Sequence, residues 1–491
     1  MDWFATGEYE IARQILQRGI AACFLLAFAS ALDQFPALLG EHGLLPAPRF
    51  LQRVSFRRAP SLFHWRYSDR LLRTVAWVGM LLAGTVVVGL PQAGPPWLPM
   101  LVLLLLYAGY LSIVSVGQTF YSFGWESLLL EAGFVVAFLG SAQVDTPWPV
   151  LIFLRWLVFR LEFGAGMIKI RGGQEWRNLT AMFYHHQTQP MPNPVSWYVH
   201  HLPRWFHRGE VLANHAVQLG LPFLLFAPQP VASIAAGLIV LSQLWLILTG
   251  NFAWLNWITV VLAASAVDDA AFRWLGGLVG LRSTGSGVDA EGEHPLWFVV
   301  VVLAVVLGLT VLSYRPARNL LTRHQLMNAT FNPLHLVNAY GAFGTVTTER
   351  YEVIVEGHPA VDPAVGRTAE SGWLPYEFRG KPGMVRRRPG QFAPYHLRLD
   401  WLMWFLALGS RDTRWFEVFL VRLLQGDRAT LRLLAHNPFP QQPPGLVRAR
   451  VFRYRFSTPA ERRVSRDWWV RTEVGTLVPP AALSIEADSA A

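Results

Sequence analysis

Charged side chains lie within and directly after an apolar stretch of the chain, Trp148–Ile168. They are Arg155, Arg160, Glu162 and Lys169. A charge surrounded by apolar residues is costly, so it normally faces a protein interior or a water-filled cavity and often marks a functional site. In the plainer alternative, Arg160, Glu162 and Lys169 pair with one another and hold two helices together. The sequence leaves both interpretations open.

Other polar residues flank this stretch. Glu126 and Glu131 stand at the start of the preceding apolar segment. We interpret Glu126 as compensation of a helix dipole and Glu131 as a counter-ion to Arg155 or Arg160. The polar lining predicted for a cavity is Glu131, Arg155, Arg160, Trp176, His185 and His186.

Histidines are frequent in the segment that follows: His185, His186, His200, His201, His207 and His215. Their number raises the question of a metal. No HExxH or HxxxH spacing occurs, and acidic residues nearby are few, so we expect no bound metal. An amphipathic segment anchored at a membrane interface by histidines and aromatic residues is the simpler interpretation.

The elements that position these side chains follow from composition. The chain has 491 residues, of which 53% are hydrophobic and only 15% charged. Apolar runs dominate up to about Leu312, and a more charged, arginine-rich part follows. This distribution predicts a membrane portion with several spans followed by a polar domain, divided as residues 1–314 and 315–491.

About nine segments are long enough to span a membrane, and backbone that faces lipid must be helical. We expect the first to remain as a span, because no clear signal-peptide cleavage site follows it. The candidates are Gly19–Leu39, Leu71–Leu90, Leu98–Val116, Leu128–Val144, Trp148–Ile168, Val211–Ala227, Val231–Leu248, Phe252–Val267 and Leu296–Leu312.

Several function classes are excluded or disfavoured. The net charge is +10, but no nucleic-acid-binding motif accompanies it, so anionic lipid headgroups are the expected partner rather than nucleic acid. The single cysteine, Cys23, excludes an intrachain disulfide and a thiolate zinc site. There is no G-x-S-x-G, P-loop or G-x-G-x-x-G motif, so an enzyme of the usual kinds is not expected.

Beyond Tyr314 the pattern changes to that of an α+β domain. Val346–Gly357 and Arg448–Phe456 alternate like strands, and Trp373–Gly383 is predicted to be a further strand ending in a turn. From Leu399 the chain becomes amphipathic and helical. Helices are expected through Phe416–Leu424 and Arg428–Leu434.

Blocks of sequence in this second part resemble the lipase maturation factor family. They are Asn338–Gly357, Tyr376–Gly383, Arg388–Trp401, Asn437–Pro440 and Tyr454–Phe456, and they occur in the family's order. The resemblance implies a polytopic protein of the endoplasmic reticulum membrane that helps homodimeric lipases fold and assemble. It also implies a C-terminal domain that faces the lumen and contacts the client, so the partners are membrane lipids and a lipase or another exported protein.

The resemblance further implies a set of client-binding residues in that domain. These are Tyr340, Glu349, Arg350, Glu356, Arg379, His396, Asp400 and Trp404. The frequent Arg, Ala and Pro and the compact length are typical of bacteria, which predicts the bacterial inner membrane and an unknown client. With nine spans, the domain and the arginines of Arg49–Arg73 lie on one side, which the positive-inside rule makes cytoplasmic. The resemblance to the family instead implies that the C-terminal domain lies on the lumenal side of the membrane.

A second resemblance concerns Ala165–Lys169 with Trp176 and the histidines after it. This block is similar to the HTTM membrane domain shared with vitamin K-dependent γ-glutamyl carboxylases, in which a lysine acts as base on a reduced quinone. It implies an alternative function, a membrane enzyme in which Lys169, with Glu162, acts on a lipid or quinone. The leading interpretation needs no cofactor. A transporter remains a further alternative because Gly164-x-Gly166 is compatible with a broken helix.

Overall fold

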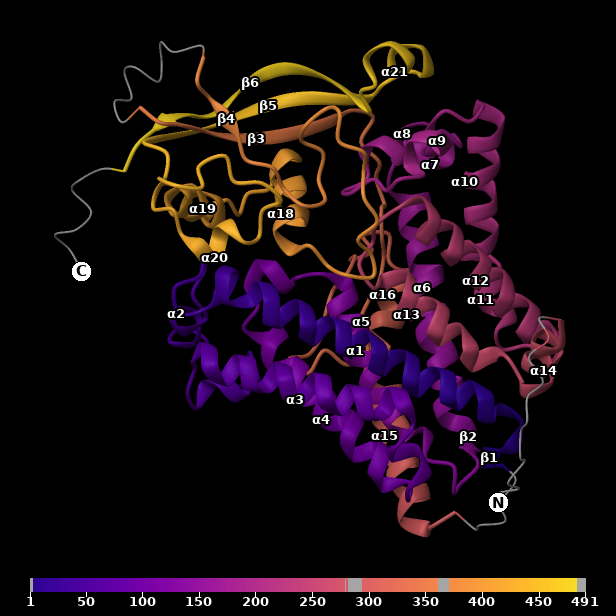
Figure 1. Cartoon of the computed structure of the whole chain (residues 1–491). Coiled ribbons are helices and arrows are strands. Elements are labelled where there is room, and N and C mark those ends of the chain that lie inside the picture. Colours follow the sequence, from indigo (N-terminus) through magenta and orange to yellow (C-terminus); the bar gives the residue numbers. More distant parts are fainter. Residues whose placement is uncertain (1–2, 279, 281–293, 361–370, 484–491) are drawn as a thin grey trace.

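The structure is a computed structural model, and it describes residues 3–278, 280, 294–360 and 371–483. A helical part formed by residues up to Leu321 packs against a C-terminal part that contains a sheet (Figure 1). The longer helices of the first part are α1 (Glu10–Leu39), α3 (Asp69–Val88), α4 (Trp97–Ser115), α5 (Gly124–Val136), α6 (Trp148–Arg171), α10 (Arg204–Leu219), α12 (Val231–Thr249), α13 (Leu255–Ala263), α14 (Asp269–Leu278), α15 (Leu296–Leu312) and α16 (Tyr314–Leu321).

Shorter elements complete the helical part. They are β1 (Ala5–Thr6), which pairs with β2 (Thr146–Pro147), and the helices α2 (Ala47–Leu51), α7 (Gln174–Arg177), α8 (Met182–Thr188), α9 (Ser196–His200) and α11 (Leu221–Leu224). Helices α7 to α10 rise beside the C-terminal sheet in Figure 1, so the two parts share a long boundary.

Five described helices are long and apolar enough to cross a membrane, or six if the bent pair Leu255–Ala266 and Asp269–Leu278 counts as one span. The expected count of about nine is therefore not confirmed, and the sidedness argument built on it has no basis. One physical reason is visible in α5, which has only 13 residues, almost all of them buried inside the protein. Apolar composition there reflects a protein core rather than contact with lipid. Helix α6 does not qualify as a span because it carries five charged residues: Arg155, Arg160, Glu162, Lys169 and Arg171.

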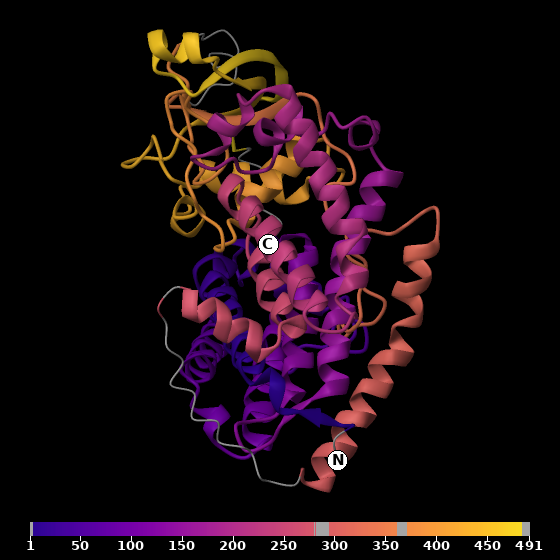
Figure 2. The ribbon, with the colours of Figure 1, turned by 90° about the vertical axis from the view of Figure 1, so that its right-hand side faces the viewer.

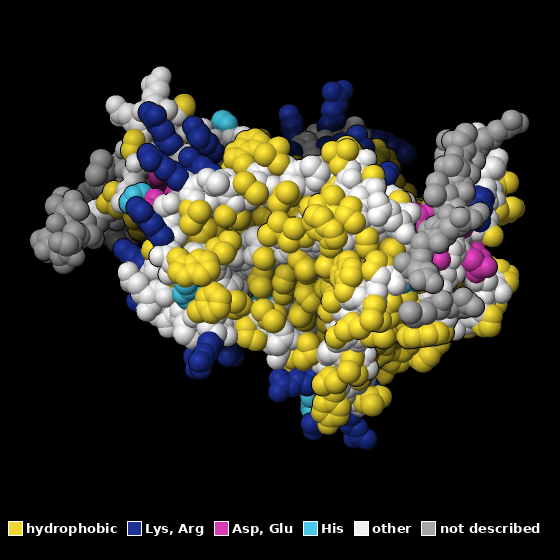
Figure 3. All heavy atoms as spheres, turned by 90° about the horizontal axis from the view of Figure 1, so that it is seen from below, with side chains coloured by type: hydrophobic (Ala, Val, Ile, Leu, Met, Phe, Trp, Pro, Cys, Tyr) yellow, Lys and Arg dark blue, Asp and Glu magenta, His cyan; other side chains and the backbone are white. Residues whose placement is uncertain are grey.

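Large apolar side chains remain exposed on the helical part, as expected of a surface that faces lipid. Figure 3 shows a broad hydrophobic face on the side away from the C-terminal sheet. Helix α15 runs along the outside of the molecule in Figure 2. Exposed residues on α3, α4 and α15 include Trp77, Leu81, Val88, Trp97, Leu101, Leu105, Val300, Leu307 and Val311.

The C-terminal part is an antiparallel sheet with helices on one side. The sheet order is β4-β3-β5-β6, formed by β3 (Arg350–His358), β4 (Leu374–Pro375), β5 (Leu446–Phe456) and β6 (Trp469–Ala481). Helices α18 (Arg398–Ala407), α19 (Arg414–Leu424) and α20 (Arg428–Leu431) lie between the sheet and the helical part (Figure 1), and α21 (Pro459–Ser465) joins β5 to β6. The predicted α+β class is correct for this part, although the predicted strand at Trp373–Gly383 shortens to two residues and β6 was not predicted.

Candidate functional site

A large cavity lies where the two parts meet. It has a volume of about 1140 Å³ and is enclosed by α6, α10, α12 and α13, by the segment after Asn338, and by α18. Its wall is mostly apolar, with aromatic side chains from both parts, among them Trp176, Phe252, Trp404 and Phe405. An apolar cavity of this size with a few polar groups has the general character of a small-molecule or lipid site.

The polar groups of the cavity form a connected chain. Lys169 Nζ donates to Asn214 Oδ1 and to Gln218 Oε1, each at 2.9 Å. Gln218 Nε2 in turn donates to Glu162 Oε2 at 3.2 Å, and Gln243 Nε2 donates to Glu162 Oε1 at 2.7 Å. The two residues predicted as catalytic are thus both buried in the cavity wall, but they are joined through the Gln218 amide rather than by direct contact.

The surroundings of Lys169 act on its charge in two opposing directions. Two amide oxygens accept from it, and its nitrogen lies 4.6 Å from the centre of the Trp176 ring. Hydrogen-bond acceptors and an aromatic face both favour a cation over a neutral amine. Burial acts in the opposite direction and lowers the pKa of the Lys169 ammonium group. The contacts of Lys169 therefore do not distinguish a fixed cation from a base.

The other predicted cavity charges lie elsewhere. Arg160 pairs with Glu131, both fully buried and outside the cavity wall, which confirms one of the two counter-ions proposed for Glu131. Arg155 has no acidic partner among the described residues. Its guanidinium donates to Ser265 O at 3.0 Å and to Tyr9 Oη at 3.0 Å. The expectation that Arg155, Arg160 and Glu131 line the cavity is therefore wrong, and so is pairing among Arg160, Glu162 and Lys169.

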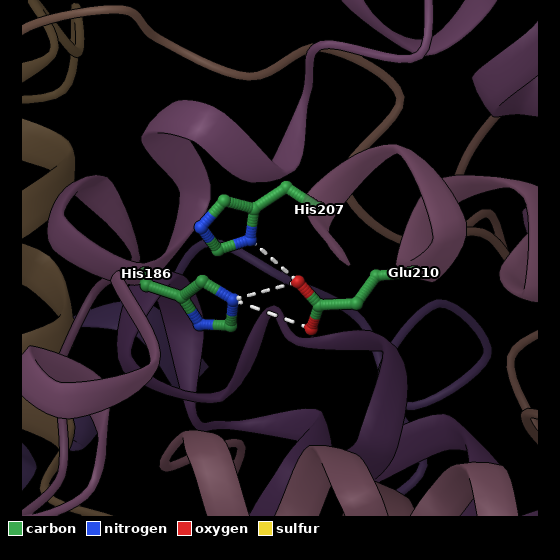
Figure 4. A group of neighbouring side chains, drawn as sticks. All are labelled: His186, His207 and Glu210. Atoms are coloured by element: carbon green, nitrogen blue, oxygen red, sulfur yellow. Dashed lines mark hydrogen bonds and ion pairs between the residues drawn. The ribbon is translucent and has the colours of Figure 1, made fainter. Parts of the chain in front are cut away.

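Of the remaining predicted residues, Trp176 and His185 do line the cavity. The indole Nε1 of Trp176 donates to Phe343 O at 2.8 Å and so ties α7 to the C-terminal part. His186 does not line the cavity, and its side chain meets His207 and Glu210 (Figure 4).

Buried ionic groups hold the C-terminal part on the helices. Arg398 Nη1 lies 2.6 Å from Glu126 Oε1, and neither side chain is exposed. Gln34 reinforces this contact from α1, since its Nε2 donates to His396 O at 2.7 Å and its Oε1 accepts from Arg398 N at 3.0 Å. Glu126 was interpreted as compensating a helix dipole, and the structure gives it a second role as the counter-ion of Arg398.

Most of the predicted client-binding residues are internal. Tyr340, Arg350, Glu356, His396 and Asp400 are each no more than 4% exposed. A buried side chain cannot touch a client in this conformation, which corrects the expectation that these five form a binding surface. Glu349 and Arg379 are the members that reach solvent, and Trp404 is half-buried in the cavity wall.

The hydrogen bonds of these residues explain why they are buried. Arg350 donates to Gln187 O at 3.0 Å and to Pro190 O at 2.9 Å, so it fixes the segment after α8 on the sheet. Asp400 accepts from the backbone N–H groups of Gly380 at 2.6 Å and Lys381 at 3.0 Å. Buried charges are retained when they are paired or hydrogen-bonded in this way.

The environment of His396 predicts a loss of stability in acid. Burial, and then the neighbouring Arg398 guanidinium, lower the pKa of His396 from 6.5 to about 4. The unfolded chain therefore binds a proton at a higher pH than the folded chain does. Neutral His396 contributes fully to the free energy of unfolding above pH 6.5, and this contribution is lost as the pH falls toward 4. The loss of unfolding free energy between pH 7 and pH 5 is roughly 2 kcal/mol.

Thermal unfolding of the purified protein at pH 7 and pH 5 measures this effect. The variant His396→Gln cannot titrate at this position and is expected to show a weaker dependence on pH. An equal dependence in both proteins would exclude His396 as its source.

Sequence reasoning missed several residues of the site. Gln243 is a neutral polar residue on the apolar helix α12, and that contrast was the available signal. Asn214 and Gln218 lie on the amphipathic helix α10, whose many polar residues do not single them out. His207 and Glu210 are three residues apart on α10, so one helical turn brings them to one face. Their third neighbour, His186, comes from a different helix, which only the fold reveals.

Comparison with known proteins gives two matching family models. The lipase maturation factor transmembrane domain matches residues 11–274, and the lipase maturation factor C-terminal domain matches residues 336–479. Lipase maturation factor 1 of Homo sapiens is 39% identical over 97% of this chain and 89% of its own length. The mouse protein of the same name (Mus musculus) is 38% identical over 97% and 88%, and lipase maturation factor 2 of Homo sapiens is 31% identical over 96% and 83%.

No solved structure matches the chain significantly. The matched relatives named above are mammalian, so a bacterial inner membrane is not supported. The comparisons also give no support to the resemblance to the HTTM domain.

Proposed function

The chain belongs to the lipase maturation factor family, and on that premise we propose that it is a membrane-embedded maturation factor for lipases. One observation carries the proposal: similarity to proteins named lipase maturation factor 1 extends over 97% of this chain and most of their length, and it includes both domains. The endoplasmic reticulum membrane is the location that fits such relatives.

The geometry supports a role in holding another protein rather than in chemistry. The Arg398–Glu126 pair and the hydrogen bonds of Gln34 fix the C-terminal part on the membrane helices. A rigid domain at a membrane suits the presentation of a surface to a client. Neither the enzyme nor the transporter alternative is favoured, because the matched relatives are named lipase maturation factors.

We place the client surface on the exposed side of the C-terminal part. Of the predicted contact residues, Glu349 is exposed there. Arg379 is about one-third exposed and lies at the boundary with the helical part, 3.5 Å from Asp33 of α1. Glu349 lies 3.1 Å from Arg453, and both side chains are about half exposed. Exposed ion pairs of this kind add little to stability, so they are free to exchange partners with a bound protein.

Crosslinking in the native membrane tests this placement. A tagged chain, co-expressed with a lipase and treated with a lysine- and acid-reactive crosslinker, is expected to give crosslinks between the lipase and the C-terminal part. The double variant Glu349→Gln/Arg379→Gln is expected to reduce them several-fold. Arg73→Gln, outside this part, serves as the matched control. Lipase crosslinks found only on the membrane helices, or none at all, contradict the proposal.

A further inference from the structure

Two histidines and a carboxylate meet in the interior beside the cavity. His186 comes from α8, while His207 and Glu210 come from consecutive turns of α10, and Figure 4 shows the three side chains pointing toward one another. His186 and His207 are at most 2% exposed, and the Glu210 side chain is 8% exposed. All three residues offer atoms that bind transition metals.

The distances between these atoms approach those of a metal site. His207 Nδ1 lies 2.7 Å from Glu210 Oε2, and His186 Nε2 lies 3.4 Å from Glu210 Oε1. The possible ligand atoms all lie within 4.8 Å of one another. Ligands 2.0–2.1 Å from a tetrahedral zinc ion are separated by about 3.3 Å. Small side-chain rotations therefore bring the three atoms to one ion.

The hydrogen bonds of His207 give a second, independent indication. Its Nδ1 faces the Glu210 carboxylate, and its Nε2 faces the backbone oxygen of His200 at 3.3 Å. A neutral imidazole has a single N–H and cannot donate to both oxygens. A metal ion bound to Nδ1 removes this conflict, because Nε2–H then donates to the carbonyl. Metal-bound histidines commonly make that outer hydrogen bond.

Glu210 has a matching outer partner. The indole Nε1 of Trp245, on α12, donates to Glu210 Oε1 at 2.9 Å. This bond orients the carboxylate and leaves Oε2 toward His207. Hydrogen-bonded second partners of this kind accompany metal-binding carboxylates.

We propose that His186, His207 and Glu210 bind a divalent transition-metal ion, with zinc favoured by the two imidazoles and one carboxylate. The ion joins α8 to α10. The segment just after His186 carries the carbonyls of Gln187 and Pro190 that accept from Arg350. The metal therefore stabilises the surface on which the C-terminal part rests.

Metal content of the full-length protein tests the proposal. The protein, purified in detergent with a tag that contains no histidine, is treated with EDTA, supplied with zinc and freed of unbound metal. The wild type is expected to retain about one zinc ion per chain, and His207→Gln and Glu210→Gln are expected to retain almost none. His42→Gln, at an exposed histidine, is the matched control and is expected to retain the ion.

Two further measurements do not depend on the folding of the ligand variants. Calorimetric titration of zinc into EDTA-treated wild type is expected to give one site, and Trp245→Phe, which keeps all three ligands, is expected to weaken it by about 10-fold. EDTA is expected to lower the thermal midpoint of the wild type. If the wild type retains no more zinc than His207→Gln and titrates without a site, the cluster is a metal-free His207–Glu210 ion pair and the proposal is wrong.

Discussion

Replacement of Arg398 with methionine is expected to lower the free energy of unfolding by about 3–5 kcal/mol, because it leaves a buried carboxylate without its counter-charge. Arg398 lies 2.6 Å from Glu126, and neither side chain is exposed. The same guanidinium donates to Phe120 O at 2.9 Å. The variant therefore loses both the charge pair and a hydrogen bond between the two parts of the molecule.

Chemical denaturation in detergent measures this loss, and hydrogen exchange locates it. Exchange is expected to rise in residues 395–408, where α18 meets the helices. The double variant Arg398→Met/Glu126→Gln removes both charges and is expected to lose less than Arg398→Met alone. Arg453→Met, which breaks the exposed pair with Glu349, is the control and is expected to cost less than about 1 kcal/mol. Equal losses in the buried and exposed variants would show that Arg398 does not hold the parts together.

The second large effect is expected at Glu131. This carboxylate pairs with Arg160 and accepts at Oε2 from the backbone N–H of Asn338 at 2.9 Å and from Tyr340 Oη at 2.7 Å. Glu131→Gln keeps the shape but removes the charge, so the buried Arg160 guanidinium loses its counter-ion. A loss of about 3–5 kcal/mol follows from such an unpaired charge.

The position of this effect distinguishes it from the first. Hydrogen exchange is expected to increase in residues 336–347, of which residues 340–347 line the cavity, and to stay unchanged in residues 395–408. Glu473→Gln, at an exposed carboxylate that pairs with Arg450, is the control. Unchanged exchange in residues 336–347 of Glu131→Gln would show that Glu131 does not anchor this segment.

The sequence predicted the kinds of elements better than their surroundings. Period and composition correctly predicted the strand that became β5, and the predicted start of helix at Leu399 is one residue from the start of α18. These patterns are local, so the sequence records them directly. The count of nine spans is not confirmed, and α5 shows why: an apolar helix buried by protein has the same composition as one that faces lipid.

The candidate site was likewise predicted only in part from the sequence. Charges in an apolar stretch correctly indicated buried polar groups, since a charge facing lipid is too costly. One partner, Glu131 for Arg160, was predicted although 29 residues separate the two. The contact of Glu131 with Asn338, 207 residues further along the chain, was not predicted, because only the fold brings the two together. The family resemblance likewise singled out blocks of sequence without distinguishing surface residues such as Glu349 from internal ones such as Asp400.

The specific activity of a secreted lipase tests the central claim most directly. Cells that lack their own lipase maturation factors are given a dimeric lipase with this chain, with its Arg398→Met variant or with an empty vector. Lipase activity is then divided by lipase mass in the medium. The proposed function predicts high specific activity with the wild-type chain, little with Arg398→Met, and none above background with the vector. A specific activity with the wild-type chain equal to that with the vector, at matched expression in the same membrane, would contradict it.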